Sequence, residues 1–531
     1  MIGYQFLLEI DALNASHVAV TCRFCCQPGF TGGGYTWEPR VVDPGLQQVS
    51  LFSADKITGR STYSYGEIVL GNFKNTDTLS GPTDYLKDYT FYGRPVRMYM
   101  GPVGASYPSG FPQVYTAVIE GTNINEDTVS FTLRGRQSEL DIPLETGTFL
   151  GNNVAPGGVE GIPTMKSSRK PAILGRVFNM SPVPCNTSRL IYAVSPLTGI
   201  ADITQLNSGF QVFDNGVELF CDEVVADYTY LMEPYAMARP GMYKASPDGY
   251  IQLGATPAGQ VTCSGASDGM ALISHPINLI TQILTLADAA PNRTHANFVD
   301  MIDGSTFTDF EDKYERGVVT TGQNISALLD FLVAPCGYWY FTATGKLRVR
   351  TMKLTGYATP VYIAVMGTNI TSAFFRKTTD TKGGVPASKV TLKCGKNYSL
   401  QTNVAGSVDP LRLHRLSTEW LTYTVGSWTY TYPLSEEFVV ETALTRSTRF
   451  EDGYTLGLTL SNMMSRTHDL LDIEIITTEF LNVYNINPGD IITVNLNGRF
   501  GYSGKDMMVV SKTINFVDEI VKFTLWGMEG I

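Results

Sequence analysis

The sequence predicts a mainly β protein with minor α content, in which β-rich regions stand on either side of a mixed α and β region. Fifty-one glycines and 27 prolines predict many turns, and the 28 tyrosines accompany short runs that alternate apolar and polar residues. The chain of 531 residues is too long for a single hydrophobic core, so we expect three or four domains.

The composition argues against some functions. A net charge of −11 is unfavourable for wrapping nucleic acid by phosphate neutralisation, although it allows an acidic channel through which DNA passes without binding. No apolar run reaches the roughly 20 residues that span a bilayer, and Glu9 and Asp11 lie where a signal peptide would be apolar. We therefore expect no membrane insertion, and folding in a cytoplasm that keeps the eight cysteines as free thiols.

Residues 1–150 predict a β-barrel or sandwich. In the run TVSFTLRGR, Val129, Phe131 and Leu133 face one way while the residues between them face the other, which is the period of a strand. The glycine- and asparagine-rich stretch between Glu120 and Asp127 predicts a hairpin loop.

The next two regions differ in character. Residues 151–170 are rich in glycine and proline and predict an exposed arm or linker, which we expect to reach a neighbouring molecule because such a strap gains order on contact. Residues 171–270 predict a β-rich inserted domain, in which Asp214-Asn215-Gly216 favours a tight turn between two strands.

Residues 271–384 predict an inserted α+β domain. Apolar residues at helical spacing favour one helix beginning at Pro276 and another capped by Asn324. The second helix precedes the hairpin GYWYFTATGKLRVR, in which alternation sends Tyr338 and Tyr340 to one face. We favour packing over sugar binding for these aromatic residues.

Residues 385–531 return to alternating strands, such as IITVNLNG, DMMVVSKTI and IVKFTLWG. The segment Phe438–Leu471 is less strand-like, and its second half predicts a helix lying across the barrel.

Chemical motifs are absent from the sequence. None of the five histidines has a metal-ligand spacing, and there is no G-x-S-x-G elbow or phosphate-binding loop. Cys22, Cys25 and Cys26 are weak candidates for a metal site, because a closed site needs about four ligands and no second pair follows. We expect no enzyme activity, no catalytic residue and no cofactor.

Four stretches resemble the baseplate hub and tail-tip proteins of long-tailed bacteriophages. They are YSYGEIVLGN with the later LKDYTFYGRPVRMYMG; VSFTLRGRQSELDIPL; SSRKPAILGRVFNMSPV; and ISALLDFLVAPCGYWYFTATGKLRVR with the closing NINPGDIITVNLNGRFGYSGKDMMVVSKTINFVDEIVKFTLWG. Together these stretches span nearly the whole chain.

The resemblance implies two tube-like β-barrel domains, at 1–150 and 385–531, which flank the inserted β and α+β domains. Three chains would then present six barrels in one ring, so that a homotrimer meets a six-fold tail tube. The chain ends directly after the second barrel, so we expect it to lack the long C-terminal fibre of larger hub proteins.

The implied function is a structural virion protein whose hub ring closes the tail tube, anchors fibre proteins and opens for DNA passage. The implied partners are further copies of the chain, the distal tail protein and tail tube, tail fibre or tip proteins, and the tape measure protein. The expected location is the tail tip of the virion, after assembly in the cytoplasm of the bacterial host.

Six basic residues are the candidate assembly interface, three on the second strand of the hairpin and three at the end of the arm: Lys346, Arg348, Arg350, Lys166, Arg169 and Lys170. We expect the first three to meet an acidic neighbouring chain.

Three alternatives stay open. A hexameric distal tail ring protein would need one barrel in each chain rather than two. A tail-associated enzyme that degrades cell-wall polymer would need a cleft with converging carboxylates. A carbohydrate-binding adhesin would use exposed aromatic residues such as Trp339.

Overall fold

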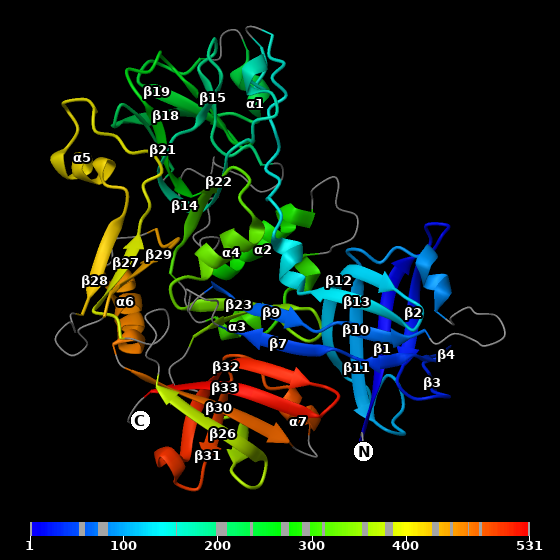
Figure 1. The fold of residues 1–531 in the computed structure, drawn as a ribbon. Helices are drawn as coiled ribbons and strands as arrows, with labels where there is room; N and C mark the ends of the chain where they lie inside the picture. The colour runs from blue at the N-terminus through cyan, green and yellow to red at the C-terminus, as the bar shows by residue number, and fades with distance from the viewer. Residues whose placement is uncertain are drawn as a thin grey trace. The chain divides into compact units, whose positions relative to one another are not determined.

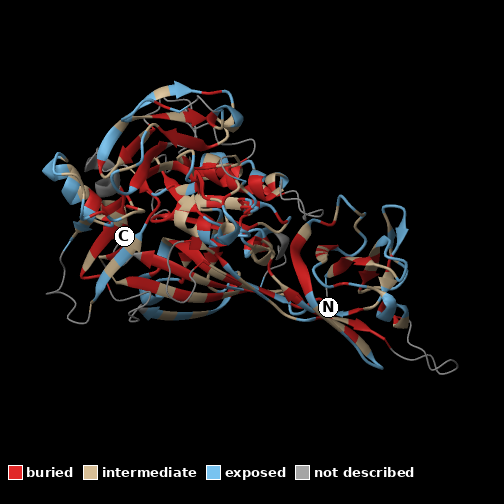
Figure 2. Ribbon diagram, turned by 90° about the horizontal axis from the view of Figure 1, so that it is seen from above, coloured by how far each residue is buried: buried red, intermediate tan, exposed pale blue. Residues whose placement is uncertain are grey.

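The computed structural model describes these residues: 3–51, 59–72, 83–154, 157–197, 210–233, 237–266, 275–288, 298–310, 314–352, 359–377, 386–426, 435–445, 450–465, 467–476 and 480–528. Buried residues run along the strands, whereas exposed residues gather at turns and loops (Figure 2). The predicted mainly β fold with minor helix is confirmed.

The chain divides into two compact units. Unit 1 comprises Met1–Leu140, Tyr338–Pro386 and Arg466–Ile531, and unit 2 comprises Asp141–Gly337 and Ala387–Ser465. The sequence predicts domains that are continuous segments, whereas each of these units is assembled from segments far apart in the chain.

Unit 1 contains two barrel-like sheets. In the first, barrel I, the strand order is β5-β2-β1-β11-β12-β13-β10-β6. Its strands are β1 (Tyr4–Leu13), β2 (Ala19–Cys25), β5 (Glu38–Pro39), β6 (Val41–Asp43), β10 (Ile68–Gly71), β11 (Pro95–Pro102), β12 (Gln113–Ile124) and β13 (Thr128–Arg134). Only Arg40 separates β5 from β6, so one short segment pairs with both ends of the order and nearly closes the barrel.

The second sheet, barrel II, has the strand order β25-β31-β32-β33-β30-β26. Its strands are β25 (Tyr362–Val365), β26 (Ile370–Lys377), β30 (His468–Ile476), β31 (Ile491–Asn495), β32 (Ser503–Asn515) and β33 (Ile520–Met528). The two end strands, β25 and β26, are again neighbours in the sequence. In both sheets, therefore, one continuous segment pairs with the strands at both ends of the order, and we call it the closing segment.

The two barrels share one topology. In each, the closing segment is parallel to the strand at one end of the order and antiparallel to the strand at the other end. The antiparallel partner, β10 or β30, pairs next with the last strand of a three-stranded meander, β11-β12-β13 or β31-β32-β33. Barrel I differs by the hairpin β1-β2, which lies between its meander and the closing segment.

Irregularities fall at matching positions on the middle strand of each meander. An unpaired extra residue interrupts β12 at Val114 and Glu120, and β32 at Gly504 and Val510. The two bulges are six residues apart in both strands. Because a bulge bends and twists its strand, the middle strands of both meanders are bent at matching positions.

Two further details match. The closing segment carries an extra residue opposite β10 at Val42 and opposite β30 at Thr371. The meander of each barrel is entered through a glycine with positive φ, Gly93 at 74° and Gly489 at 87°, a conformation that favours glycine. The N–H of each glycine donates to the carbonyl of the residue just before the second bulge.

The cores match in sequence as well. The last strand of each meander reads V-x-F-T-L-x-G, as VSFTLRG at residues 129–135 and VKFTLWG at residues 521–527. Phe131 and Phe523 are both fully buried in a hydrophobic cluster to which both barrels contribute. The two barrels are therefore two copies of one fold, closed by the same device.

Two hairpins accompany the barrels in unit 1. The hairpin β7 (Leu46–Ser50) and β9 (Thr62–Tyr65) follows the closing segment of barrel I, and β7 pairs with β32 of barrel II (Figure 1). The hairpin β23 (Gly337–Phe341) and β24 (Leu347–Thr351) forms a small sheet with β8 (Gly59–Arg60).

Short elements complete unit 1. They are β3 (Thr31–Gly32), β4 (Tyr35–Thr36), helix α7 (Phe480–Tyr484), and the 3-10 helices η1 (Asp84–Asp88), η2 (Arg136–Leu140) and η6 (Arg499–Gly501).

Unit 2 is built on a nine-stranded sheet of order β15-β16-β20-β19-β18-β17-β21-β14-β22. Its strands are β14 (Ala172–Met180), β15 (Val183–Asn186), β16 (Ile191–Ala193), β17 (Gln211–Asp214), β18 (Val217–Val224), β19 (Met242–Ser246), β20 (Tyr250–Leu253), β21 (Val261–Ala266) and β22 (Gly317–Thr320). The predicted turn between β17 and β18 is confirmed, with positive φ at Asn215 and Gly216.

The rest of unit 2 combines helices with a second sheet of order β28-β27-β29. The elements are α1 (Tyr228–Leu231), α2 (Pro276–Asp288), α3 (Thr306–Asp309), α4 (Ile325–Val333), α5 (Pro410–Ser417), α6 (Phe450–Met464), η3 (Pro163–Met165), η5 (Val299–Met301), β27 (Lys389–Cys394), β28 (Leu421–Val425) and β29 (Glu437–Glu441). Helices α2, α4 and α6 confirm the three predicted helices, but α6 packs on β27 and β28 rather than across a barrel.

Candidate functional site

The outer face of barrel I carries a polar network that its inner face lacks. Even-numbered residues of β1 such as Leu8 and Ile10 enter the hydrophobic core, so Glu9 and Asp11 lie on the opposite, outer face. Strands β2 and β11 flank β1 and bring Arg23 into register with Glu9 on that face.

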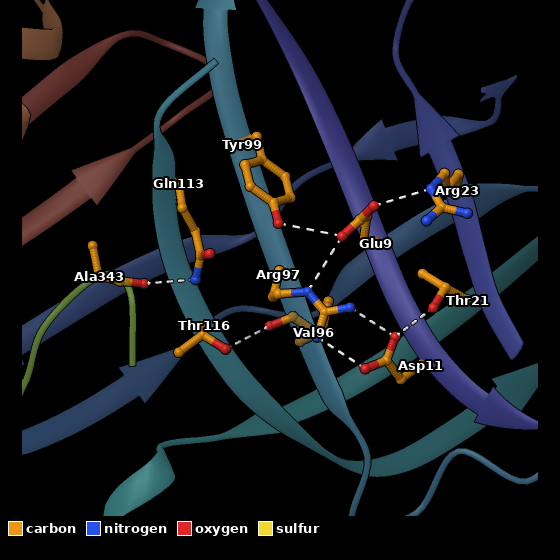
Figure 3. Close-up of polar contacts among 10 residues, drawn as sticks. All are labelled: Glu9, Asp11, Thr21, Arg23, Val96, Arg97, Tyr99, Gln113, Thr116 and Ala343. Carbon is orange, nitrogen blue, oxygen red and sulfur yellow. Dashed lines mark hydrogen bonds and ion pairs between the residues drawn. The ribbon is translucent and has the colours of Figure 1, made fainter. Parts of the chain in front are cut away.

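Two carboxylates and two guanidinium groups form this network (Figure 3). Arg97 donates to both oxygens of Asp11 at 2.7 and 2.9 Å, and its Nε donates to Glu9 at 3.3 Å. Glu9 also accepts from Arg23 at 3.0 Å and from the Tyr99 hydroxyl at 3.2 Å. Each charge in the network therefore has an opposite charge beside it.

The network shifts the protonation of its members. Burial by itself raises the pKa of the Asp11 carboxyl, but the hydrogen bond and charge of Arg97 outweigh burial and leave that pKa below its ordinary value. The pKa of the Tyr99 hydroxyl is raised by burial and then by the charge of Glu9. The network is therefore stable in its ionised form at neutral pH.

An apolar cluster lies beside the network on the same outer face. Leu7 of β1 and Cys25 of β2 pack there against Trp37 and Phe111. Tyr107 joins the cluster and makes an edge contact with the Trp37 ring, with ring centroids 5.2 Å apart. Barrel I is thus covered on its outside by a small second core.

The equivalent outer positions of barrel II carry different chemistry. By the shared register, Arg97 and Thr116 of barrel I correspond to Thr493 and Asp506 of barrel II. Thr493 donates a single hydrogen bond to Asp506, so a neutral donor replaces the guanidinium. The barrels share the buried V-x-F-T-L-x-G strand, whereas these matched outer positions carry different groups.

Barrel II has its own polar ladder across β26, β30 and β33. Asp472 pairs with Arg376 at 3.3 Å and accepts from Thr524 at 2.7 Å. Glu474, two residues further along β30, pairs with Lys522 at 2.7 Å. This outer face is partly exposed, so its ion pairs contribute little to stability but fix a pattern of charge on the surface.

These arrangements support no catalytic chemistry that we can assign. In the outer-face network, the carboxylates are neutralised by adjacent guanidinium groups, which is the opposite of the environment that raises an acid's pKa for proton transfer. Within the described ranges, no group of three or more His, Cys, Asp or Glu residues is placed to hold a metal ion. No helix among the same residues is long and apolar enough to cross a membrane.

The structure separates the cysteines that were weak metal candidates. Cys22 enters the core of barrel I, whereas Cys25 belongs to the apolar cluster on the outside, so the two thiols point to opposite faces of β2. Cys26 accepts a hydrogen bond from the backbone N–H of Phe6. Burial raises the pKa of Cys22 and of Cys25 to about 11, which keeps both as neutral thiols rather than thiolate ligands.

The hairpin β23-β24 places its residues as alternation predicts. Tyr338 stacks on Tyr340, and Trp339 meets the edge of Phe341 on the other face of the strand. All four rings are at most 5% exposed, so none offers a free face to a sugar. This removes the support for sugar binding at Trp339.

The three basic residues of this hairpin have unequal surroundings. Lys346 is exposed and Arg348 is half-buried, while Arg350 forms an ion pair with Asp490 at 2.7 Å inside unit 1. Charge reversal at Arg350 would therefore disturb the fold of unit 1, because it would leave Asp490 facing a like charge. An interface role for Lys346 and Arg348 stays a prediction.

The glycine-rich segment 151–170 is less extended than the sequence predicts. The N–H of Gly151 donates to Glu160 O at 2.8 Å, so the described part of the segment folds back on itself. Val159 is buried in a cluster with Phe149. Other residues of the segment, such as Val154 and Ile162, are exposed, and its role as an arm that reaches a neighbouring molecule stays a prediction.

The basic residues at the end of that segment are mostly engaged within unit 2. Lys170 pairs with Glu160 at 2.6 Å, and Arg169 pairs with Glu145. Lys166 is exposed. A role for Lys166, Arg169 and Lys170 in an assembly interface stays a prediction.

Sequence reasoning missed the network on barrel I. Its signal is the pair Glu9 and Asp11, two acids two residues apart in a strand that is otherwise strongly apolar. Alternation places both acids on one face, but only the pairing of β1 with β11 supplies Arg97, which lies 86 residues from Asp11 in the chain.

The sequence matches no known protein family and no curated protein. Solved structures that align with nearly the whole chain include a 43 kDa prophage tail protein from Shewanella oneidensis, at 11% identity, 98% coverage of both chains and a TM-score of 0.35. A tail protein from Neisseria meningitidis aligns at 10% identity, with 100% of this chain and 98% of that chain covered and a TM-score of 0.34.

A prophage tail protein from Listeria monocytogenes aligns at 10% identity, with 99% of this chain and 95% of that chain covered and a TM-score of 0.35.

Proposed function

We propose that this chain is a structural protein of a bacteriophage tail tip, in which three copies form a hub ring that closes the tail tube. The ring also anchors fibre proteins and opens for DNA passage. The observation that carries the proposal is the duplication in unit 1, where one chain presents two barrels of the same topology with matching bulges.

Duplication solves a problem of symmetry. A three-fold assembly and a six-fold tube cannot make equivalent contacts unless each chain of the trimer supplies two similar modules. Barrels I and II are similar in topology and in the spacing of their bulges, and they differ in their outer faces. Such a chain meets six equivalent partners while keeping two kinds of outward surface for other proteins.

The acidic composition is consistent with this role. A net charge of −11 disfavours retention of a passing phosphate backbone, so DNA would cross the ring without specific binding. The expected neighbours are the tail tube, the distal tail protein, fibre or tip proteins and the tape measure protein.

Native mass spectrometry of the purified full chain tests the copy number. We expect three copies of the 58.2 kDa chain. Six copies would favour the distal ring protein, and a monomer at all concentrations would contradict a ring. Zymography on cell-wall polymer tests the enzyme alternative in parallel, and clearing of the polymer would support it.

A further inference from the structure

Strand β32 of barrel II has a partner that its counterpart in barrel I lacks. The first half of β32 pairs with β31, and after the second bulge Ser511–Asn515 pairs with β7 of the hairpin that follows the closing segment of barrel I. The second half of β32 extends beyond its pairing with β31, and in barrel II the edge of this half is covered by β7.

In barrel I the same edge has no partner in the described part of the chain. The chain begins to pair with β12 at Gly93, just before β11, where the N–H of Gly93 donates to the carbonyl of Ile119. Ile119 is the last residue of β12 that bonds on this side. The next residues, Gly121–Ile124, pair with β13 on one side, and no described strand pairs with them on the other. They correspond through the shared bulge to Ser511–Ile514.

Burial at equivalent positions shows the effect of the missing strand. Ile514 lies beneath the β7 hairpin and is 0% exposed, whereas the equivalent Ile124 is 37% exposed. An apolar side chain and a row of backbone groups are thus both left uncovered at one edge of barrel I. Such an edge is a template for another strand.

We propose that Gly121–Ile124 of β12 is a docking edge for a strand of a second copy of this chain. The inference rests on the proposed ring. Within one chain, the β7 hairpin bridges barrel I to β32 of barrel II. In a ring in which barrels I and II alternate, barrel II of one chain lies next to barrel I of the following chain. The edge of that barrel I that is equivalent to the β7-binding edge of β32 is Gly121–Ile124 of β12. The added strand runs antiparallel to β12, as β7 does to β32, and covers Ile124.

The test uses the full-length chain and the variant Ile124→Asp, which places a charge where the incoming strand would lie. Val103→Asp is the matched control, because Val103 is an apolar residue of barrel I with 52% exposure, away from this edge. We expect Ile124→Asp to weaken self-association at least tenfold in sedimentation equilibrium, with an unchanged circular dichroism spectrum, while Val103→Asp associates like the wild type.

Hydrogen exchange gives a second readout that does not depend on a variant. Those amides of Gly121–Ile124 that do not bond to β13 should exchange at least tenfold more slowly in the assembled protein than in the dilute monomer. If the wild type forms trimers in which these amides stay unprotected, and Ile124→Asp also assembles normally, the docking edge is wrong. The proposed ring would not be affected by that result. A chain that stays monomeric at every concentration would overturn both.

Discussion

Barrels I and II share their topology and a buried core strand, and they differ on their outer faces. Their cores use the same motif, V-x-F-T-L-x-G, and their middle strands have bulges six residues apart. On the outside, barrel I has a network of paired charges and a small apolar cluster, whereas barrel II has a partly exposed polar ladder. What the copies share maintains the fold, and what they do not share is available for separate partners.

The largest expected effect tests whether the two cores are equivalent. Phe131→Ala and Phe523→Ala each remove a buried ring from the same cluster and should each lower the free energy of unfolding by about 3–5 kcal/mol. Urea unfolding followed by tryptophan fluorescence measures both costs. Tyr230→Ala, at an exposed position of unit 2, should change the value by less than about 0.5 kcal/mol. A cost at only one of the two phenylalanines would break the comparison.

The next effect separates the barrels by pH. Lys512 of barrel II is buried and donates to the carbonyls of Tyr484 and Ile486, and burial lowers its pKa to about 8. The equivalent position in barrel I is Thr122, which does not titrate. In the unfolded chain the lysine pKa is about 10.4, so between these values the unfolded state binds more protons and stability rises with pH.

Relative to Lys512→Met, the free energy of unfolding of the wild type should therefore rise by roughly 2–3 kcal/mol between pH 8 and 10.5, because the two proteins differ only in this titrating group. Urea titrations at several pH values measure the slope, and an identical slope in the two proteins would show that Lys512 is not the group responsible.

A smaller effect sharpens the contrast between the outer faces. Arg97→Ala leaves Glu9 and Asp11 half-satisfied and should cost about 2–3 kcal/mol, whereas Thr493→Ala at the matching position should cost about 1 kcal/mol. Because the pKa of Asp11 is lowered in the fold, this contribution is present above the ordinary aspartate pKa and is lost as the pH falls through the folded value.

The difference between wild type and Arg97→Ala should therefore shrink below about pH 4. Thermal unfolding at pH 7 and at pH 3 measures it. Equal costs for the two substitutions at pH 7 would mean that the outer faces are energetically alike.

Local patterns in the sequence predicted the elements well. Alternation identified the last strands of both meanders, and the Asp214-Asn215-Gly216 signal identified the turn between β17 and β18. Helices α2 and α4 follow their apolar spacing, although the side chain of Asn324 makes no capping hydrogen bond. In each case the physical cause lies within a few residues of its effect.

Long-range pairing was not predictable in the same way. Strand β7 joins β32, more than 400 residues away, and no pattern inside LQQVS specifies that partner. The repeat of V-x-F-T-L-x-G was present in the sequence, but alternation alone identifies each copy as an ordinary strand. The register of the bulges is what relates the copies, and register appears only when partners are known.

Electron microscopy of the isolated ring, viewed along its axis, tests the central claim most directly. If the barrels are duplicate modules, averaged images should show six similar densities around the axis, contributed by three chains. Three densities, six complete chains, or particles without rotational symmetry would contradict the claim that one chain fills two neighbouring places.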